Sequence, residues 1–243
     1  MMRYTRPDRM LPVLLGLSGC LGGAEPPPVA SVAVPETTSR SRTAIGCGDW
    51  TLESGPGTSL SLYRGARSLS VDLFPDEISG GASLRPGTPV ADMSLVSSVV
   101  LASELPEGAR IEWGLHDGSD RLPKAAIRLE REGIPSVRLL RQARPGEAAT
   151  IDGLVVEAQR LEATRGTVVL QRRGPSVLLK ALWGRATMVQ RAEIGSAPLE
   201  LSVSLSWPRG ADKARGRSIG LLFERLEVQD TSGRITQDVL ACP

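Results

Sequence analysis

Histidine and aromatic residues are scarce in this chain of 243 residues: His116 is the one histidine, and aromatic side chains fill 3% of the positions. A single histidine excludes any metal site that needs several imidazole ligands. Charge of one sign is also lacking, because 29 Lys and Arg stand against 27 Asp and Glu, so we expect no nucleic-acid partner. No apolar run approaches the roughly 18–20 residues that a membrane-spanning helix needs. The remaining composition, 41% hydrophobic, is that of a core-forming protein.

The first 20 residues have the pattern of an export signal. Three arginines precede a short apolar stretch, residues 10–17, which is too short to span a bilayer. The stretch ends in Leu17-Ser18-Gly19-Cys20, which resembles the lipobox of bacterial lipoproteins. This resemblance implies that residues 1–19 are a signal peptide and that Cys20 is acylated after cleavage. The alternative is a plain signal peptide with an accidental cysteine.

Acylation of Cys20 would place the protein in the cell envelope as a lipid-anchored protein. Without residues 1–19 the chain carries equal numbers of basic and acidic residues. The membrane would therefore be engaged through the acyl chains on Cys20 and not through charge. The next residue is Leu21 and not Asp, which by resemblance to enterobacterial sorting favours the outer membrane.

A spacer follows the expected acylation site. Residues 20–43 are rich in Pro, Ser and Thr and contain no aromatic residue, so they bury too little surface to fold alone. We expect a partly extended tether there. Residues 44–243 then form a single domain, because no second linker divides them.

Two cysteines bracket that domain, Cys47 near its start and Cys242 near its end. An exported protein meets an oxidising compartment, and an even pair is what one disulfide requires. The bridge would need Cα atoms within about 7 Å of each other, which predicts that the first and last strands are neighbours. The alternative is a pair of unbridged buried thiols.

Alternation of apolar and polar residues dominates the domain. The segment Leu199–Trp207 alternates over its whole length, which is typical of a strand with one buried face. The segment Leu154–Ala163 has spacing that also fits a helix, and we favour a strand there because Val155 and Val156 are β-branched. Within that segment we expect the strand at 154–161, and the same pattern predicts strands in nine further segments: 68–73, 94–101, 109–115, 126–130, 136–141, 167–172, 176–182, 187–190 and 218–228.

Strands at this spacing predict an all-β fold, an antiparallel two-sheet β-sandwich, because half-buried strands need a second sheet to complete a core. Sandwiches of the jelly-roll and concanavalin A-like types also satisfy the constraint set by the terminal cysteine pair, since their first and last strands often pair. Within residues 112–228, the strand end Trp113-Gly114-Leu115 and the hairpin 170–174 resemble the concanavalin A-like lectin and glucanase sandwiches. That resemblance implies a glycan as a partner.

Catalytic motifs are missing from the sequence. The glucanases of that fold use Glu-x-Asp-x-x-Glu, which does not occur here, and Glu130-Arg131-Glu132 is the nearest imitation. We interpret that segment as a solvated strand end. The mature chain also lacks the Gly-x-Ser-x-Gly elbow of serine hydrolases and the glycine-rich loops that hold phosphates or dinucleotides. We therefore assign no catalytic residue, no cofactor and no metal.

One polar loop and two tryptophans are the candidates for ligand binding. His116, Asp117 and Asp120 follow a strand together, although a plain hairpin turn accounts equally for these residue types. Trp183 stands at a strand end before Gly184, and Trp50 follows Gly48-Asp49 near the start of the domain. We expect both to be exposed at the rim as platforms for sugar stacking, with Trp183 as the first choice.

These features favour a lipid-anchored envelope lipoprotein with a non-catalytic sandwich that binds a glycan or an envelope protein. An exported glycan hydrolase is the first alternative, and it would need two converging carboxylates on one sheet face. A structural or assembly subunit is the second, and it would show a large flat apolar patch.

Overall fold

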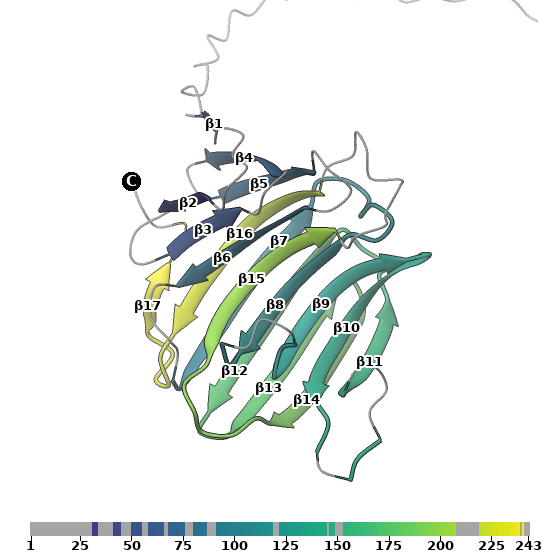
Figure 1. The fold of residues 1–243 in the computed structure, drawn as a ribbon, viewed down its shortest axis with the longest axis vertical. Helices are drawn as coiled ribbons and strands as arrows, with labels where there is room; N and C mark the ends of the chain where they lie inside the picture. The colour runs from purple at the N-terminus through teal and green to yellow at the C-terminus, as the bar shows by residue number, and fades with distance from the viewer. Residues whose placement is uncertain are drawn as a thin grey trace, which may run out of the picture.

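The computed structural model describes residues 31–33, 41–44, 50–54, 58–65, 68–75, 80–86, 91–118, 122–144, 146–148, 153–207, 219–238 and 240. Strands are the only regular elements within these ranges, and they form two antiparallel sheets stacked face to face (Figure 1). The search for a helix long and apolar enough to cross a membrane finds none among these residues.

The front layer in Figure 1 is an eight-stranded sheet. Most of its neighbours are hairpin partners, and β15 joins it between β8 and β6 from a distant part of the chain. Its order is β11 (Leu154–Arg160), β10 (Ile134–Gln142), β9 (Ala125–Glu132), β8 (Arg110–His116), β15 (Glu200–Trp207), β6 (Gly80–Pro86), β3 (Trp50–Ser54) and β2 (Ser41–Ala44).

The layer behind is a nine-stranded sheet. Its long central strand β16 pairs with both β5 and β7, and a bulge between Phe223 and Arg225 shifts its register against β7. Its order is β1 (Ser31–Ala33), β4 (Thr58–Gly65), β5 (Ser68–Pro75), β16 (Ile219–Gln229), β7 (Met93–Leu101), β12 (Arg165–Arg173), β13 (Ser176–Trp183) and β14 (Ala186–Glu193), with β17 (Ile235–Asp238) paired to β16 beside this path.

The predicted all-β sandwich is confirmed, and so is the strand at Leu154–Arg160. Strand ends were predicted too short at several places, because pairing continues into polar residues such as Arg173 and Glu193 that carry no alternation signal. Alternation alone missed β3, β4, β6 and β17. Glycine and proline at both ends of β6 (Gly80–Pro86) conceal its short apolar pattern.

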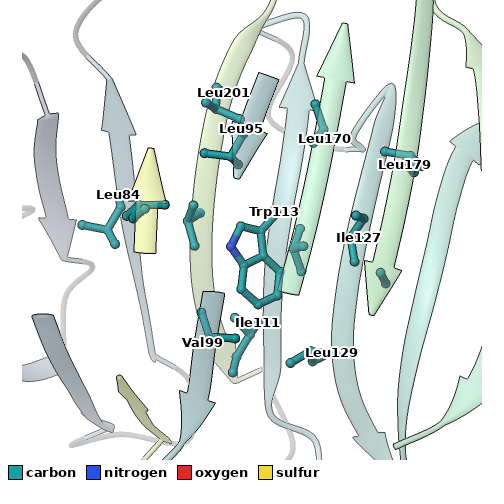
Figure 2. Close-up of a cluster of buried hydrophobic side chains, with 14 of the residues drawn as sticks. Leu84, Leu95, Val99, Ile111, Trp113, Ile127, Leu129, Leu170, Leu179 and Leu201 are labelled. Carbon is teal, nitrogen blue, oxygen red and sulfur yellow. The ribbon is translucent and has the colours of Figure 1, made fainter. Parts of the chain in front are cut away.

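The core lies between the sheets, and strands such as β12 and β13 contribute every second side chain to it. Trp113 is fully buried, and its ring lies among aliphatic side chains from both layers (Figure 2). Its indole Nε1 donates a hydrogen bond to the buried hydroxyl of Ser97 on β7, at 3.1 Å. This bond pairs the one polar atom that the ring brings into an apolar interior and ties β8 to the opposite sheet.

The structure corrects part of the prediction for the N-terminal spacer. Ser31–Ala33 pairs with β4 and Ser41–Ala44 pairs with β3, so parts of the segment expected to lack regular structure are strands. The expected domain start at residue 44 therefore falls at the end of β2. Sheet pairing outweighs local composition here, since an edge strand needs only backbone hydrogen bonds from its neighbour.

The first and last described strands are not paired with each other. The first strand, β1, pairs with β4, and the last, β17, pairs with β16, so the predicted neighbourhood of the two end strands is wrong as a hydrogen-bonded pairing. Cys47 and Cys242 lie outside the described residues, as does Cys20. The disulfide and the acylation site remain predictions.

Candidate functional site

Charged side chains gather on the outer face of the eight-stranded sheet, the face toward the viewer in Figure 1. Alternation directs Ile111, Trp113 and Leu115 of β8 into the core, which leaves the intervening residues on the outer face. Register then aligns the outer residues of neighbouring strands in rows. One row is Ser204, Glu112, Arg128 and Arg138, and the next is Ser206, Arg110, Glu130 and Ser136.

We define the charged cluster as the seven outer-face residues in and beside these rows that carry or can carry a charge. It contains three cations and three anions, with a histidine at one end, so it is formally balanced. Its members are Arg110, Glu112, His116, Arg128, Glu130, Glu132 and Arg138.

Glu130 is the centre of this cluster, with a side chain only 1% exposed. Arg138 Nη1 lies 2.7 Å from its Oε1. Arg128 Nη1 and Arg110 Nε lie 3.6 Å and 3.7 Å from its Oε2. The expectation that Glu130 sits at a solvated strand end is wrong, because the stems of three arginines on β8, β9 and β10 cover it. Glu132, 52% exposed, does fit that expectation.

The contacts of Glu130 are ionic and poorly directed. Among the described residues, neither of its carboxylate oxygens has a hydrogen-bond partner with aligned geometry, although both are buried. A buried carboxylate with unfilled acceptor positions is costly unless nearby charges compensate it. The three arginines provide that compensation, so this carboxylate holds their guanidinium groups together at the surface.

A second unit of the cluster joins Arg128, Glu112 and His116. Arg128 donates from Nε to Glu112 Oε2 at 2.7 Å, and its Nη2 lies 2.6 Å from the same oxygen. The other oxygen, Oε1, lies 3.8 Å from His116 Nε2. One carboxylate thus faces a fixed cation on one side and a titratable imidazole on the other.

Gly114 makes room for the imidazole. A Cβ at this position would lie 2.7 Å from His116 Nε2 and 3.2 Å from Glu112 Oε1. The imidazole therefore lies against the strand backbone between its own position and Glu112, where any larger residue would displace it. The hydroxyl-bearing Ser202 is opposite Gly114 on β15, so a polar strand continues the face next to the histidine.

Of the predicted polar loop, His116, Asp117 and Asp120, one residue contributes to this site. His116 belongs to the charged cluster, whereas Asp117 forms an ion pair with Lys124, with Nζ 2.8 Å from Oδ2. Asp120 lies outside the described residues. No group of three or more potential metal ligands occurs in the part of the chain that the structure describes.

The predicted tryptophan platform is corrected. Trp50 and Trp183 are both fully buried, so neither ring is exposed at the rim for stacking. Trp183 points inward because it alternates with Leu182 at the end of β13, and its Nε1 donates to the Ala163 carbonyl at 2.6 Å. Its ring occupies the space above Gly166, where a Cβ would lie 2.1 Å from Trp183 Cε3.

The sequence does contain a signal for the charged cluster, but the signal is divided between strands that lie apart in the chain. Arg110 and Glu112 alternate with core residues in one strand, and Arg128 and Glu130 do so in the next. Each strand alone indicates an ordinary solvated face. Only the register between β8, β9 and β10 brings the charges into contact, and register between strands is not visible in alternation within one strand.

No protein-family model matches the chain, and no curated protein sequence matches it significantly. Solved structures do match its fold. An alginate lyase from Klebsiella pneumoniae superposes with a TM-score of 0.55 and 12% identity, covering 76% of this chain and 96% of that one. An alginate lyase from Pseudomonas aeruginosa gives a TM-score of 0.50 and 17% identity, covering 70% and 86%. At these identities the likeness shows a shared concanavalin A-like sandwich fold, and it does not assign an activity.

Proposed function

We propose that this protein is a lipid-anchored envelope protein whose sandwich binds a glycan on the outer face of the eight-stranded sheet without cleaving it. The observation that carries the proposal is the charged cluster: seven polar groups from β8, β9 and β10 whose geometry is set before any ligand arrives. Fixed groups on rigid strands bind at a low entropic cost.

The chemistry of the face suits a polyhydroxylated ligand. Guanidinium groups and carboxylates offer charge-assisted donors and acceptors to sugar hydroxyls. Serine hydroxyls of β15 and β6 line the next strands, at Ser202, Ser204, Ser206 and Ser83. Two of the solved structures that share this sandwich fold are alginate lyases, which supports a polysaccharide as the ligand class.

The carboxylates support binding and not hydrolysis. Glycoside hydrolysis by two carboxyl groups needs one that donates a proton and one that stays ionised. All three carboxylates of the cluster contact arginines, and Glu112 is engaged by two atoms of Arg128. None of them has the apolar surroundings that produce a general acid.

A glycan-cleaving enzyme is the second candidate, and one contact favours it. His116 beside Glu112 is an acid–base pair at the edge of the same face. The binding proposal and the enzyme proposal differ in the fate of the polymer, which a direct measurement separates.

Calorimetric titration of the protein with alginate and with a neutral mixed-linkage glucan tests the binding proposal. We expect binding of at least one polymer and no change in its chain length after prolonged incubation. His116→Ala and Arg128→Gln should each weaken binding about tenfold or more, since each removes a charged or polar contact. Arg165→Gln is the matched control, because Arg165 is 71% exposed on the outer face of the other sheet.

Three results would count against this proposal. Failure of both polymers to bind would remove the glycan proposal. Detection of new reducing ends or unsaturated uronates would show that the polymer is cleaved, and the enzyme proposal would replace the binding proposal. Equal weakening by Arg165→Gln would place the ligand elsewhere. A thermal melt of each variant separates lost binding from lost folding.

The lipid anchor is tested independently. The lipobox Leu17-Ser18-Gly19-Cys20 supports acylation at Cys20. We expect labelled palmitate to be incorporated into the wild-type protein and not into Cys20→Ala, which should move from the membrane fraction to the soluble one. A Cys20→Ala protein that stays in the membrane would contradict the anchor and leave the glycan proposal unaffected.

A further inference from the structure

Strand β14 ends the nine-stranded sheet with an edge that no described strand covers. It pairs with β13 without a break over all eight of its residues and contains neither a proline nor a bulge. Figure 1 places it at the margin of the rear layer. Regular edges of this length are templates for pairing with another chain, and most proteins protect them.

The hairpin geometry shows which backbone groups of β14 face outward. Trp183 and Ala186 close the hairpin around Gly184 and Arg185, so they form a hydrogen-bonded pair. Hydrogen-bonded pairs recur at every second residue, which directs the backbone groups of Ala186, Met188, Gln190 and Ala192 toward β13. The N–H and C=O groups of the intervening residues, Thr187, Val189, Arg191 and Glu193, point to the open edge.

The other edge strand on this side of the sandwich is protected in a way that β14 is not. In β11, Glu157 and Gln159 alternate onto the inner side and are exposed, so an added strand could not bury an apolar face there. In β14 the inner side chains Met188 and Ala192 are buried and apolar. Inward-pointing charged groups are a known protection against edge pairing, and Glu157 provides one in β11. The inner residues of β14, including the half-buried Gln190 between Met188 and Ala192, carry no charge.

The outer side of β14 displays a hydrophobic residue at its centre. Val189 is 50% exposed and is one of four exposed large hydrophobic side chains among the described residues. It continues a row that crosses the outer face through Val96, Val169 and Lys180. A strand added at this edge would cover Val189.

The charges of β14 select a second copy of the same strand as the added one. In an antiparallel pair centred on Val189, Val189 faces its own copy, Thr187 faces Arg191, and Arg185 faces Glu193 on the same outer side. A register one residue lower places Arg185 against Arg191. A register one residue higher places Val189 against Arg191 and leaves Glu193 without a cation. Of these three registers, only the one centred on Val189 pairs opposite charges, and it also keeps the whole length of β14 paired.

We propose that two copies of this protein associate edge to edge through β14, antiparallel around a two-fold axis at Val189, and so join their nine-stranded sheets into one. This association leaves the outer face of both eight-stranded sheets open. A polymeric ligand could then contact two equivalent charged clusters at once, which raises avidity without new contacts. The dimer does not depend on the glycan-binding proposal.

Light scattering after size exclusion tests the association on the full chain carrying Cys20→Ala, so that acyl chains do not drive self-association. We expect a concentration-dependent dimer. Arg185→Glu and Glu193→Arg should each raise the dimer dissociation constant about tenfold, because each places like charges opposite each other twice across the two-fold axis. The double variant Arg185→Glu/Glu193→Arg should restore the wild-type constant.

Two further variants keep the test independent of folding. Val189→Pro removes an edge-facing N–H that β13 does not use, so it should give a monomer with a nearly unchanged melting temperature. Arg173→Glu makes the same charge change as Arg185→Glu at the exposed end of β12, two strands from this edge, and it should stay dimeric. A wild-type monomer at every concentration, or a double variant that stays as weak as the single ones, would overturn the proposal.

Discussion

The outer faces of the two sheets differ, although both arise from the same alternation. On the eight-stranded sheet a row reads Ser204, Glu112, Arg128 and Arg138, and its charges contact one another. On the nine-stranded sheet a row reads Val96, Val169, Lys180 and Val189. The inner faces of both sheets are largely apolar. A shared core thus leaves the outer faces free to differ, and we propose ligand contact on one sheet and association at the edge of the other.

Ion pairs on the two faces differ in burial as well. Glu130 is 1% exposed among three arginines. Glu224 on β16 is 31% exposed, and Arg165 contacts it with a side chain that is 71% exposed. Exposed pairs contribute little because water screens them, whereas removing one member of a buried group leaves uncompensated charge.

Replacing Glu130 should give the largest effect on stability. Glu130→Gln keeps the size of the side chain and removes the charge that three arginines share, so we expect a loss of about 2–4 kcal/mol in the free energy of unfolding, below the fully buried limit because the arginines are partly solvated. Glu224→Gln should cost less than about 1 kcal/mol. Urea unfolding of both variants measures the contrast. Equal losses in the free energy of unfolding would mean that burial does not make the Glu130 contacts more important for stability than the Glu224 ion pair.

Adding one methyl group under Trp183 should rank next. Gly166→Ala would place Cβ 2.1 Å from Trp183 Cε3, and the fully buried ring has no space to move into. We expect a loss of about 1–3 kcal/mol or more, as for other overpacked cores, and a lower melting temperature. A variant as stable as the wild type would show that Trp183 can repack.

The same substitution on the other sheet should affect binding and not folding. In Gly114→Ala the new Cβ meets the imidazole of His116, which is 21% exposed and can rotate outward. The stability change should stay within about 1 kcal/mol, while glycan affinity falls with the displaced imidazole. Calorimetry together with a thermal melt checks both. Unchanged affinity with a lost fold would reverse the roles given to the two glycines.

Acid should give the smallest effect, and again a different one on each sheet. The pKa of Glu147, in the loop between β10 and β11, is lowered from 4.5 to about 2, first by hydrogen bonds from the Arg141 side chain and then by the Arg144 backbone N–H. A carboxyl group whose pKa is lower in the folded than in the unfolded state stabilises the fold at pH values above its unfolded pKa. For Glu147 this contribution to stability is lost as pH falls from about 4.5 to about 2.

The matched residue on the other sheet is Asp230, in the turn between β16 and β17. The hydroxyl of Ser232 and nearby backbone N–H groups lower its pKa. These donors are a hydroxyl and backbone N–H groups and not an arginine side chain, so Asp230→Asn should change the acid dependence of the melting temperature less than Glu147→Gln. Melting temperatures measured from pH 7 to pH 2 would compare them. A larger change for Asp230→Asn would contradict the part given to Arg141.

Prediction from sequence succeeded where one strand contains the whole signal. Ile111, Trp113 and Leu115 alternate within β8, and each is fully buried as their period indicates. It failed at Trp50 and Trp183, because position at a strand end does not show what packs against the ring. It also misjudged Glu130, since three arginines on three strands bury a residue that its own neighbours in sequence leave polar.

The sequence by itself determined the all-β class, the two-sheet arrangement and most of the inner face, because apolar burial depends on a period that each strand carries locally. Tertiary structure alone decided which strands are neighbours and in what register. Register brings Glu112 against Arg128 and Glu130 against Arg138, and it leaves the edge of β14 open. These contacts join segments that are distant in the chain, so no local pattern contains them.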